Sequence, residues 1–423
     1  MPKSLSPPRV PRPASPAPRA GVSLLEVLIA MFVITIGLLG VAALIPTGHF
    51  AVVKSTEADR AAACGRAALS EVATREMLVP TTWRWPTGNY AGPGAALYAA
   101  QYGDAFAIDP LFIAQNVVAV APNYSRLAAF PYDSDYNPPG TPPPTWGPYF
   151  LHRITYADVS GTMTPAVLPP SIANRIFTFG DDLIFETERT EPDQRARASV
   201  LWNTGRVGPY PDPTAATTDF PLLQQNAGHY TWLLTVSPAA TEIGGTSFRK
   251  YTVSAVVSHR RDTVYLPIDP SNPPDAENMP PERLATVVSF DGGGYGGGDV
   301  TLGIPTGVAN AGNNFDAAQR EAYLKVKPGN WIMLLGVKYD ARISPPRADL
   351  GNQQARRVAN WYRVVSVDDE VVQESGNWIR RVTLDGPDWE PSDALIPPPF
   401  NQSHAVLMDD VIGVYTKTIE VGE

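Results

Sequence analysis

The chain has 423 residues and a formal net charge of −9, which is distributed unevenly. Residues 1–21 contain four of the 33 basic residues and none of the 42 acidic ones, so the rest of the chain is strongly acidic. An acidic body argues against a nucleic-acid-binding platform, which would carry a basic surface. The single cysteine, Cys64, excludes an intrachain disulfide and a cysteine-rich zinc site.

The chain begins with a basic arm, in which residues 2–20 are rich in proline, serine, alanine and arginine. This composition cannot bury enough apolar surface to fold, so we expect the arm to be disordered. Positive charge beside an apolar segment favours retention on the cytoplasmic side of a membrane. The arm therefore predicts a cytoplasmic N-terminus.

An apolar run follows the arm without a break from Val22 to Ile45, and a helix of this length would span roughly 36 Å, enough to cross a bilayer. Its one charged residue, Glu26, would cost about 2.5–3.5 kcal/mol at the centre of a membrane and less near an end. Three interpretations are open: a secretory signal cleaved near residues 41–43, a plain membrane anchor, or a segment in which a partner compensates the carboxylate.

Gly21, Val22 and Glu26 support the third interpretation. A glycine ends the basic leader, an apolar residue follows, and a glutamate stands at the fifth position after the glycine. This arrangement resembles the type IV prepilin motif, which type IV pilins share with the pseudopilins of type II secretion. The family usually has phenylalanine where this chain has Val22. Residues 36–40 are further similar to PilV-type minor pilins, and the whole resemblance covers roughly residues 15–79.

The resemblance implies processing and assembly. A prepilin peptidase, which is also the N-methyltransferase, would cut after Gly21 and methylate Val22. The carboxylate of Glu26 would pair with the N-terminal amine of a neighbouring pilin or pseudopilin subunit. The resemblance also implies an inner-membrane precursor that crosses the membrane once, with its C-terminal region periplasmic or in a surface filament.

The helical pattern continues beyond the apolar run. Small and apolar residues recur at three- and four-residue steps through Ala61, Gly65, Ala68 and Val72, and Pro80 ends the pattern. We therefore expect a membrane half of the stem helix at 22–46 and an amphipathic half at 47–79, with Pro46 between them.

Beyond Pro80 the sequence changes to short β-prone runs separated by proline and glycine. We expect an α+β fold in which the stem helix packs on an antiparallel sheet within a pilin-like domain at 80–264. Residues 230–236 and 251–257 are expected to be neighbours in this sheet, and 175–179 to be a further strand. A proline-rich linker at 265–282 and a second, all-β module at 283–423, either a small barrel or a sandwich, complete the expected fold.

The sequence predicts no enzyme and no cofactor. Residues 133–137 match the start of a calcium loop, but prolines occupy the positions where that loop needs glycine and glutamate, so we expect a turn and treat calcium only as an alternative. The glycine-rich segment 292–298 precedes a strand and not a helix, which favours a hairpin loop over a dinucleotide site. Arg260 and Arg261 are interpreted as a polar strand end.

These features together predict a minor type IV pilin or pseudopilin that is assembled through its N-terminal helix, at low copy or at a tip. The alternative is a membrane-anchored or exported carbohydrate-binding protein or hydrolase with an ordinary signal or anchor. Processing near residues 41–43 would favour that alternative.

Overall fold

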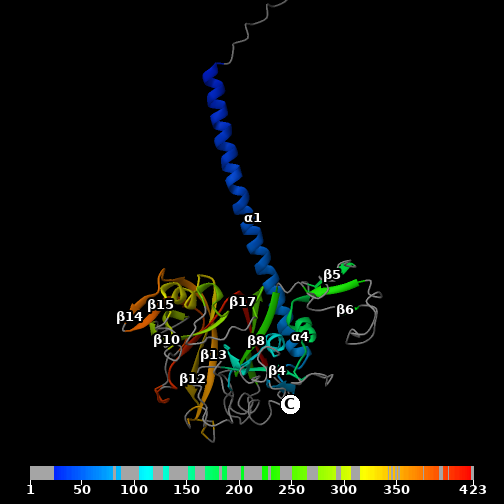
Figure 1. Ribbon diagram of the computed structural model, residues 1–423, viewed down its shortest axis with the longest axis vertical. Coiled ribbons are helices and arrows are strands. Elements are labelled where there is room, and N and C mark those ends of the chain that lie inside the picture. Colours follow the sequence, from blue (N-terminus) through cyan, green and yellow to red (C-terminus); the bar gives the residue numbers. More distant parts are fainter. Residues whose placement is uncertain are drawn as a thin grey trace, which may run out of the picture. The chain divides into compact units, whose positions relative to one another are not determined.

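The structure is a computed structural model of the chain (Figure 1). It describes residues 23–420 except for 80–81, 87–103, 118–126, 133–150, 158–166, 181–182, 188–201, 204–221, 227–229, 239–249, 264–274, 292–296, 306–314, 342, 344–345, 348–349, 351–352, 375, 390–393 and 399. The chain divides into two compact units, residues 1–57 and 58–423, which are described separately.

Helix α1 (Leu24–Thr74) is continuous in the structure and includes Pro46. It ends at Thr74, five residues before the predicted end at residue 79. Glu76 adopts a left-handed backbone conformation (φ 51°), and the Met77 and Glu76 amides donate to the carbonyls of Val72 (3.0 Å) and Ala73 (3.4 Å). These two bonds form a Schellman motif, which satisfies the last carbonyls of the helix and turns the chain away from its axis.

The second unit contains a seven-stranded sheet in which β3 pairs with β4 and the other strands follow the order β1-β4-β2-β8-β9-β17. The bounds are β1 (Trp83–Arg84), β2 (Phe106–Ile108), β3 (Ala129–Phe130), β4 (Leu151–Tyr156), β8 (Tyr230–Pro238), β9 (Lys250–His259) and β17 (Val411–Glu420). The predicted pairing of 230–236 with 251–257 is confirmed, with Trp232 opposite Val257. The sheet is not wholly antiparallel, because β2 and β4 are parallel neighbours.

One face of this sheet is apolar. Along β8, Trp232, Leu234 and Val236 alternate with residues on the opposite face, as the pleat of a strand requires. They belong to one hydrophobic cluster with the small residues of α1, namely Ala61, Cys64, Ala68 and Val72. The small side chains let the helix backbone approach the sheet closely, and Gly65 lies directly against the ring of Tyr415 on β17.

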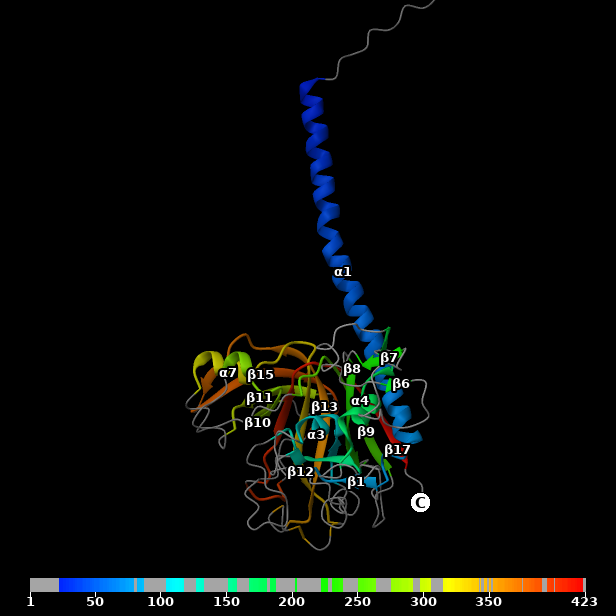
Figure 2. The same cartoon turned by 45° about the vertical axis from the view of Figure 1, so that its right-hand side comes forward.

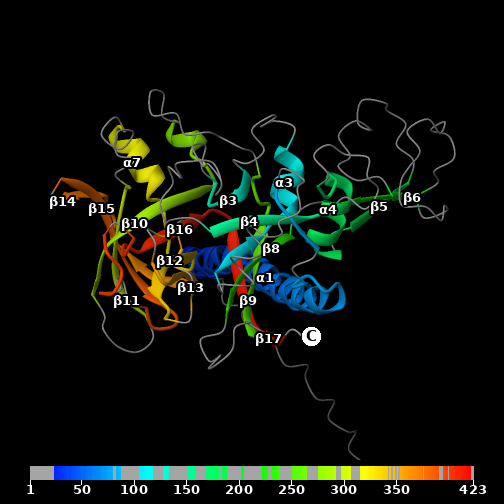
Figure 3. The ribbon, with the colours of Figure 1, turned by 90° about the horizontal axis from the view of Figure 1, so that it is seen from below.

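The second β element is a closed barrel of six antiparallel strands, in the order β10-β16-β12-β13-β15-β11 and back to β10. The bounds are β10 (Glu282–Asp291), β11 (Gly297–Gly303), β12 (Trp331–Tyr339), β13 (Ala355–Val367), β15 (Asn377–Asp385) and β16 (His404–Met408), and β14 (Val372–Glu374) is added to β15. Closure removes the free edges of the sheet. Figures 2 and 3 show this barrel beside the strands of the first sheet. The strands β10 and β11 flank the glycine-rich segment as a hairpin, and residues 292–296 lie outside the described residues.

Short helices and a small sheet accompany these two elements. They are α3 (Pro110–Asn116), α4 (Pro170–Phe177), η4 (Ala276–Asn278), α7 (Ala317–Tyr323), and a three-stranded sheet of β5 (Leu183–Thr187), β6 (Trp202–Asn203) and β7 (Leu222–Asn226). The expected strand at 175–179 was wrong. Pro170 fixes the first turn of a helix, and the strongly one-sided apolar pattern that follows lets α4 pack against the sheet.

The predicted domain boundaries differ from the structure at both ends of the barrel. The chain leaves the first sheet after β9 and returns to it in β17, so residues 283–423 are not one module. Residues 275–281 of the expected linker contain η4, and Glu282 already begins β10. Residues 404–420 form two strands, β16 and β17, because Asp410 takes a left-handed conformation (φ 66°) and turns the chain between them. The barrel is therefore an insertion between two neighbouring strands of the sheet.

The sheet and the barrel share a buried interface. Leu233 and Val256 of the sheet form one hydrophobic cluster with Met333, Leu335 and Trp361 of the barrel. The Trp361 indole N–H donates to the Thr235 hydroxyl at 2.8 Å. Interactions of this kind join the two β elements into the single unit that begins at Ala58.

A buried charge cluster lies where the chain passes from sheet to barrel. Arg261 donates to both carboxylate oxygens of Asp109 (2.9 and 2.6 Å) and to Glu282 (2.9 Å), which also pairs with Arg153. Burial opposes ionisation of Asp109, but the attraction and hydrogen bonds of Arg261, with the charge of Arg153, hold its pKa below the ordinary value. The interpretation of Arg261 as a polar strand end was wrong, because its side chain is almost fully buried.

Candidate functional site

The N-terminal part of α1 is the candidate site, and it begins with a reciprocal pair of hydrogen bonds. The Ser23 hydroxyl accepts from the Glu26 amide at 3.2 Å, and the Glu26 carboxylate accepts from the Ser23 amide at 3.2 Å. A serine at the N-cap and a glutamate three residues later form a capping box, which satisfies two amides at the helix start. The carboxylate also lies at the positive end of the helix dipole. Glu26 is therefore held beside the first residues of the helix.

The surface of α1 beyond this cap is apolar and exposed over its whole circumference. The exposed large apolar side chains are Leu24, Leu25, Val27, Leu28, Ile29, Met31, Phe32, Val33, Ile34, Ile36, Leu38, Leu39, Val41, Leu44, Ile45, Phe50, Val52 and Val53. An apolar surface of this extent marks a membrane or protein contact. A helix that is apolar on all sides is stable only where lipid or other helices surround it.

The threonine hydroxyls in this stretch form hydrogen bonds within the helix itself. The Thr35 hydroxyl donates to the Met31 carbonyl at 2.7 Å, and the Thr47 hydroxyl donates to the Ala43 carbonyl at 3.4 Å. Such bonds remove the need for water around the side chains. By its length and composition, α1 is long and apolar enough to span a membrane.

The polar part of α1 begins at the end of this surface. Lys54 and Glu57 form an exposed ion pair at 2.8 Å. Before them, Glu26 is the one charged residue between Leu24 and Val53. The segment thus combines an extended apolar surface with a single carboxylate at its N-terminal end.

The comparisons with known proteins agree with this geometry. The family described as "Prokaryotic N-terminal methylation motif" matches residues 17–42, a span that includes Gly21, Val22 and Glu26. The chain is therefore type IV prepilin-like at its N-terminus: it carries the methylation motif, and the apolar helix that begins within this motif has the character of a transmembrane segment. The search of curated proteins and the search of solved structures each found no match.

The structure describes only part of the predicted site. Glu26 lies in the first turn of α1, whereas Gly21 and Val22 lie outside the described residues, as does the candidate calcium segment at 133–137. Ser23 is the residue that sequence reasoning missed. The spacing Ser-x-x-Glu before an apolar run is a recognised capping signal, and it could have identified the pair.

Proposed function

We propose that this chain is a minor type IV pilin or pseudopilin. Its precursor is cut after Gly21, the new N-terminal residue Val22 is methylated, and the mature chain enters a pilus or a secretion pseudopilus through its N-terminal helix. The observation that carries this proposal is the exposed apolar surface of residues 24–53, which has a single carboxylate at Glu26 and overlaps the matched methylation motif at residues 17–42.

The proposed location follows from the same segment. The basic arm stays in the cytoplasm, α1 crosses the inner membrane once, and the acidic body is extracytoplasmic. A prepilin peptidase with N-methyltransferase activity is the first partner, and other pilin or pseudopilin subunits are the next. A body that begins at residue 58 and holds both a sheet and a barrel is too bulky to repeat along a tight helical bundle, which supports a low-copy or tip position.

The proposed mechanism is structural and not enzymatic. Apolar helices of neighbouring subunits pack together, and Glu26 sets their register by pairing with a neighbour's N-terminal amine. In the single chain the carboxylate accepts from the Ser23 amide, so it is already oriented toward the helix start. Exchange of this hydrogen bond from a neutral amide for an ion pair with a charged amine favours the assembled state.

The N-terminus of the membrane-derived protein tests the processing step. We expect mass spectrometry to find methylated Val22 as the first residue, and Gly21→Ala to leave the precursor uncut because the residue before the cut is changed. An intact Met1 on the wild-type protein, or a start at Leu44, would contradict the proposal. The second result would point instead to ordinary signal peptidase cleavage after residues 41–43.

Glu26→Gln tests the charge separately from the helix cap. Glutamine at this position keeps the capping box, so insertion and cleavage should remain normal. Loss of a charged hydrogen-bond partner is expected to lower incorporation into filaments about tenfold or more. The measurement is the ratio of filament-bound to membrane-bound protein by quantitative immunoblotting.

Ser23→Ala is the matched variant. It removes one capping bond and leaves the carboxylate in place. We therefore expect it to lower helix stability by about 1 kcal/mol and to leave incorporation into filaments nearly unchanged. If Ser23→Ala lowers incorporation as much as Glu26→Gln, then Glu26 acts through the cap and not through its charge.

A further inference from the structure

The side of the first sheet that faces the barrel carries a group of hydroxyl residues. Thr235 and Ser237 of β8 lie opposite Ser254 and Thr252 of β9, and Ser254 lies opposite Thr416 of β17. Residues two apart on a strand share a face, so these five side chains form one patch across three strands. The residues between them on β8, such as Leu234 and Val236, belong to the apolar cluster with α1.

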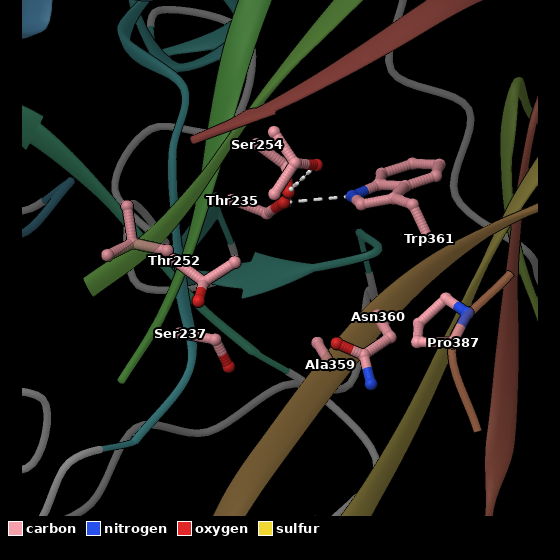
Figure 4. Close-up of a pocket in the computed structure, with 10 residues that line it drawn as sticks. Thr235, Ser237, Thr252, Ser254, Ala359, Asn360, Trp361 and Pro387 are labelled. Atoms are coloured by element: carbon pink, nitrogen blue, oxygen red, sulfur yellow. Dashed lines mark hydrogen bonds between the residues drawn. The ribbon is translucent and has the colours of Figure 1, made fainter. Parts of the chain in front are cut away.

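A cavity of about 310 Å³ lies between this patch and the barrel strand β13. Figure 4 shows the hydroxyl side chains of the sheet on one side and Ala359, Asn360, Trp361 and Pro387 on the other. Beyond the buried contact of Trp361 with Thr235, the hydroxyl patch therefore lines a space that side chains do not fill. Cavities that bind small ligands begin at about 300 Å³, so this volume suits a single ring.

The chemistry of the lining narrows the ligand class. The residues around the cavity include five hydroxyls, one amide and an indole, and none of them is charged. Hydroxyl and amide groups both donate and accept hydrogen bonds. The indole N–H of Trp361 donates to the Thr235 hydroxyl, and the hydroxyls of Ser254 and Thr416 form a hydrogen bond at 3.0 Å. These two bonds fix the orientation of the side chains that line the cavity. Ser237 and Thr252 are half-buried at the same cavity.

We propose that this cavity binds one neutral saccharide ring. A pyranose presents hydroxyls that can both donate and accept, together with an apolar C–H face that suits the indole of Trp361 and the ring of Pro387. An anion or a cation would enter without a counter-charge, which is costly in a partly buried site. A wholly apolar ligand would exclude water from the half-buried hydroxyls of Ser237 and Thr252 without replacing its hydrogen bonds. The proposal does not depend on processing or assembly of the N-terminal helix.

Calorimetric titration of the full chain tests the proposal, in a detergent without a sugar headgroup. The probes are glucose, galactose, mannose and N-acetylglucosamine, with glucuronate and glucosamine as charged analogues. At least one neutral sugar is expected to bind with a Kd of about 1 mM or below. Its charged analogue should bind about tenfold more weakly or worse. Methyl glycosides distinguish a sugar residue within a glycan from a free sugar. If the methyl glycoside still binds, the natural ligand is a glycan residue, and if it does not bind, the natural ligand is a free sugar.

Two conservative variants connect binding to this cavity. Thr252→Val and Ser237→Ala each remove one hydroxyl with little change in volume, and each should weaken binding about tenfold. Thr418→Val is the control, because this exposed hydroxyl lies on β17 opposite Thr252 and outside the cavity. Unchanged thermal unfolding shows that the variants fold. The proposal is overturned if no neutral sugar binds saturably at about 10 mM, if charged analogues bind equally well, or if a variant that combines Thr252→Val with Ser237→Ala binds like the wild type.

Discussion

Asp104→Asn is expected to lower the free energy of unfolding by about 3–5 kcal/mol, because it removes one partner of a buried ion cluster. The Asp104 carboxylate accepts from the side chains of Arg347 (2.6 Å) and Arg357 (2.9 Å) and from the Arg357 amide (2.7 Å). All three side chains are fully buried. Asparagine has nearly the same shape but no charge, so it leaves two buried guanidinium groups without this counter-charge.

The cluster also explains why the effect should extend over both β elements. Asp104 lies just before β2 of the sheet, and Arg357 lies in β13 of the barrel. The Ala105 amide donates to the Arg357 carbonyl at 3.1 Å, so the backbone is joined at the same point. We therefore expect the sheet and the barrel to unfold in one transition in the wild type and at a lower denaturant concentration in Asp104→Asn.

Urea titration followed by tryptophan fluorescence measures this shift. Glu374→Gln is the control, since Glu374 pairs with Arg381 at 2.9 Å where both side chains are more than half exposed. Exposed pairs contribute about 0–1 kcal/mol, so its midpoint should hardly move. Equal midpoints for the two variants would show that burial of the Asp104 cluster has no energetic consequence.

Local patterns in the sequence predicted much of the fold. The apolar run, the small-residue face of α1 and the paired strands 230–236 and 251–257 were visible because periodicity and β-propensity act over a few residues. The insertion of the barrel was not visible. It depends on the pairing of β9 with β17, which are separated by the whole barrel in sequence, and no local signal records such a pairing.

The buried charges were missed for a related reason. Arg261 and Asp104 look like surface residues in a sequence, because most charged residues are exposed. Their burial follows only from the contact of elements that are distant in the chain: Arg261 meets Asp109 from 152 residues away, and Asp104 meets Arg357 from 253 residues away. The interpretation of 260–261 as a polar strand end therefore failed where the barrel joins the sheet.

The N-terminal motif and the hydroxyl cavity also differ in how far the sequence reveals them. Gly21, Val22 and Glu26 stand within six residues, so their motif could be recognised directly. The hydroxyl cavity takes Thr235, Thr252, Asn360 and Thr416 from separate strands. Threonine and serine on a strand ordinarily indicate a solvated face, and only the position of β13 over that face distinguishes a cavity from a surface.

Gly65→Ala is expected to lower the free energy of unfolding by about 1–3 kcal/mol, although alanine ordinarily stabilises a helix. A Cβ at Gly65 would collide with the Cδ2 atom of Tyr415 and lie 2.5 Å from its Cγ atom. The same ring also lies against Gly413, where a Cβ would be 2.9 Å from its hydroxyl oxygen. Tyr415 therefore occupies space that two glycines leave open between α1 and β17.

A double-mutant cycle separates this contact from general effects on the helix. In a Tyr415→Ala background the cost of Gly65→Ala should shrink by about 0.5–3 kcal/mol, since the colliding ring is gone. Gly48→Ala is the matched control in the same helix, because no atom lies within 4 Å of a Cβ at that position. If Gly65→Ala costs the same with and without the Tyr415 ring, then the loss of stability arises within α1 itself. In that case Gly65 is not needed for the close approach of α1 to β17.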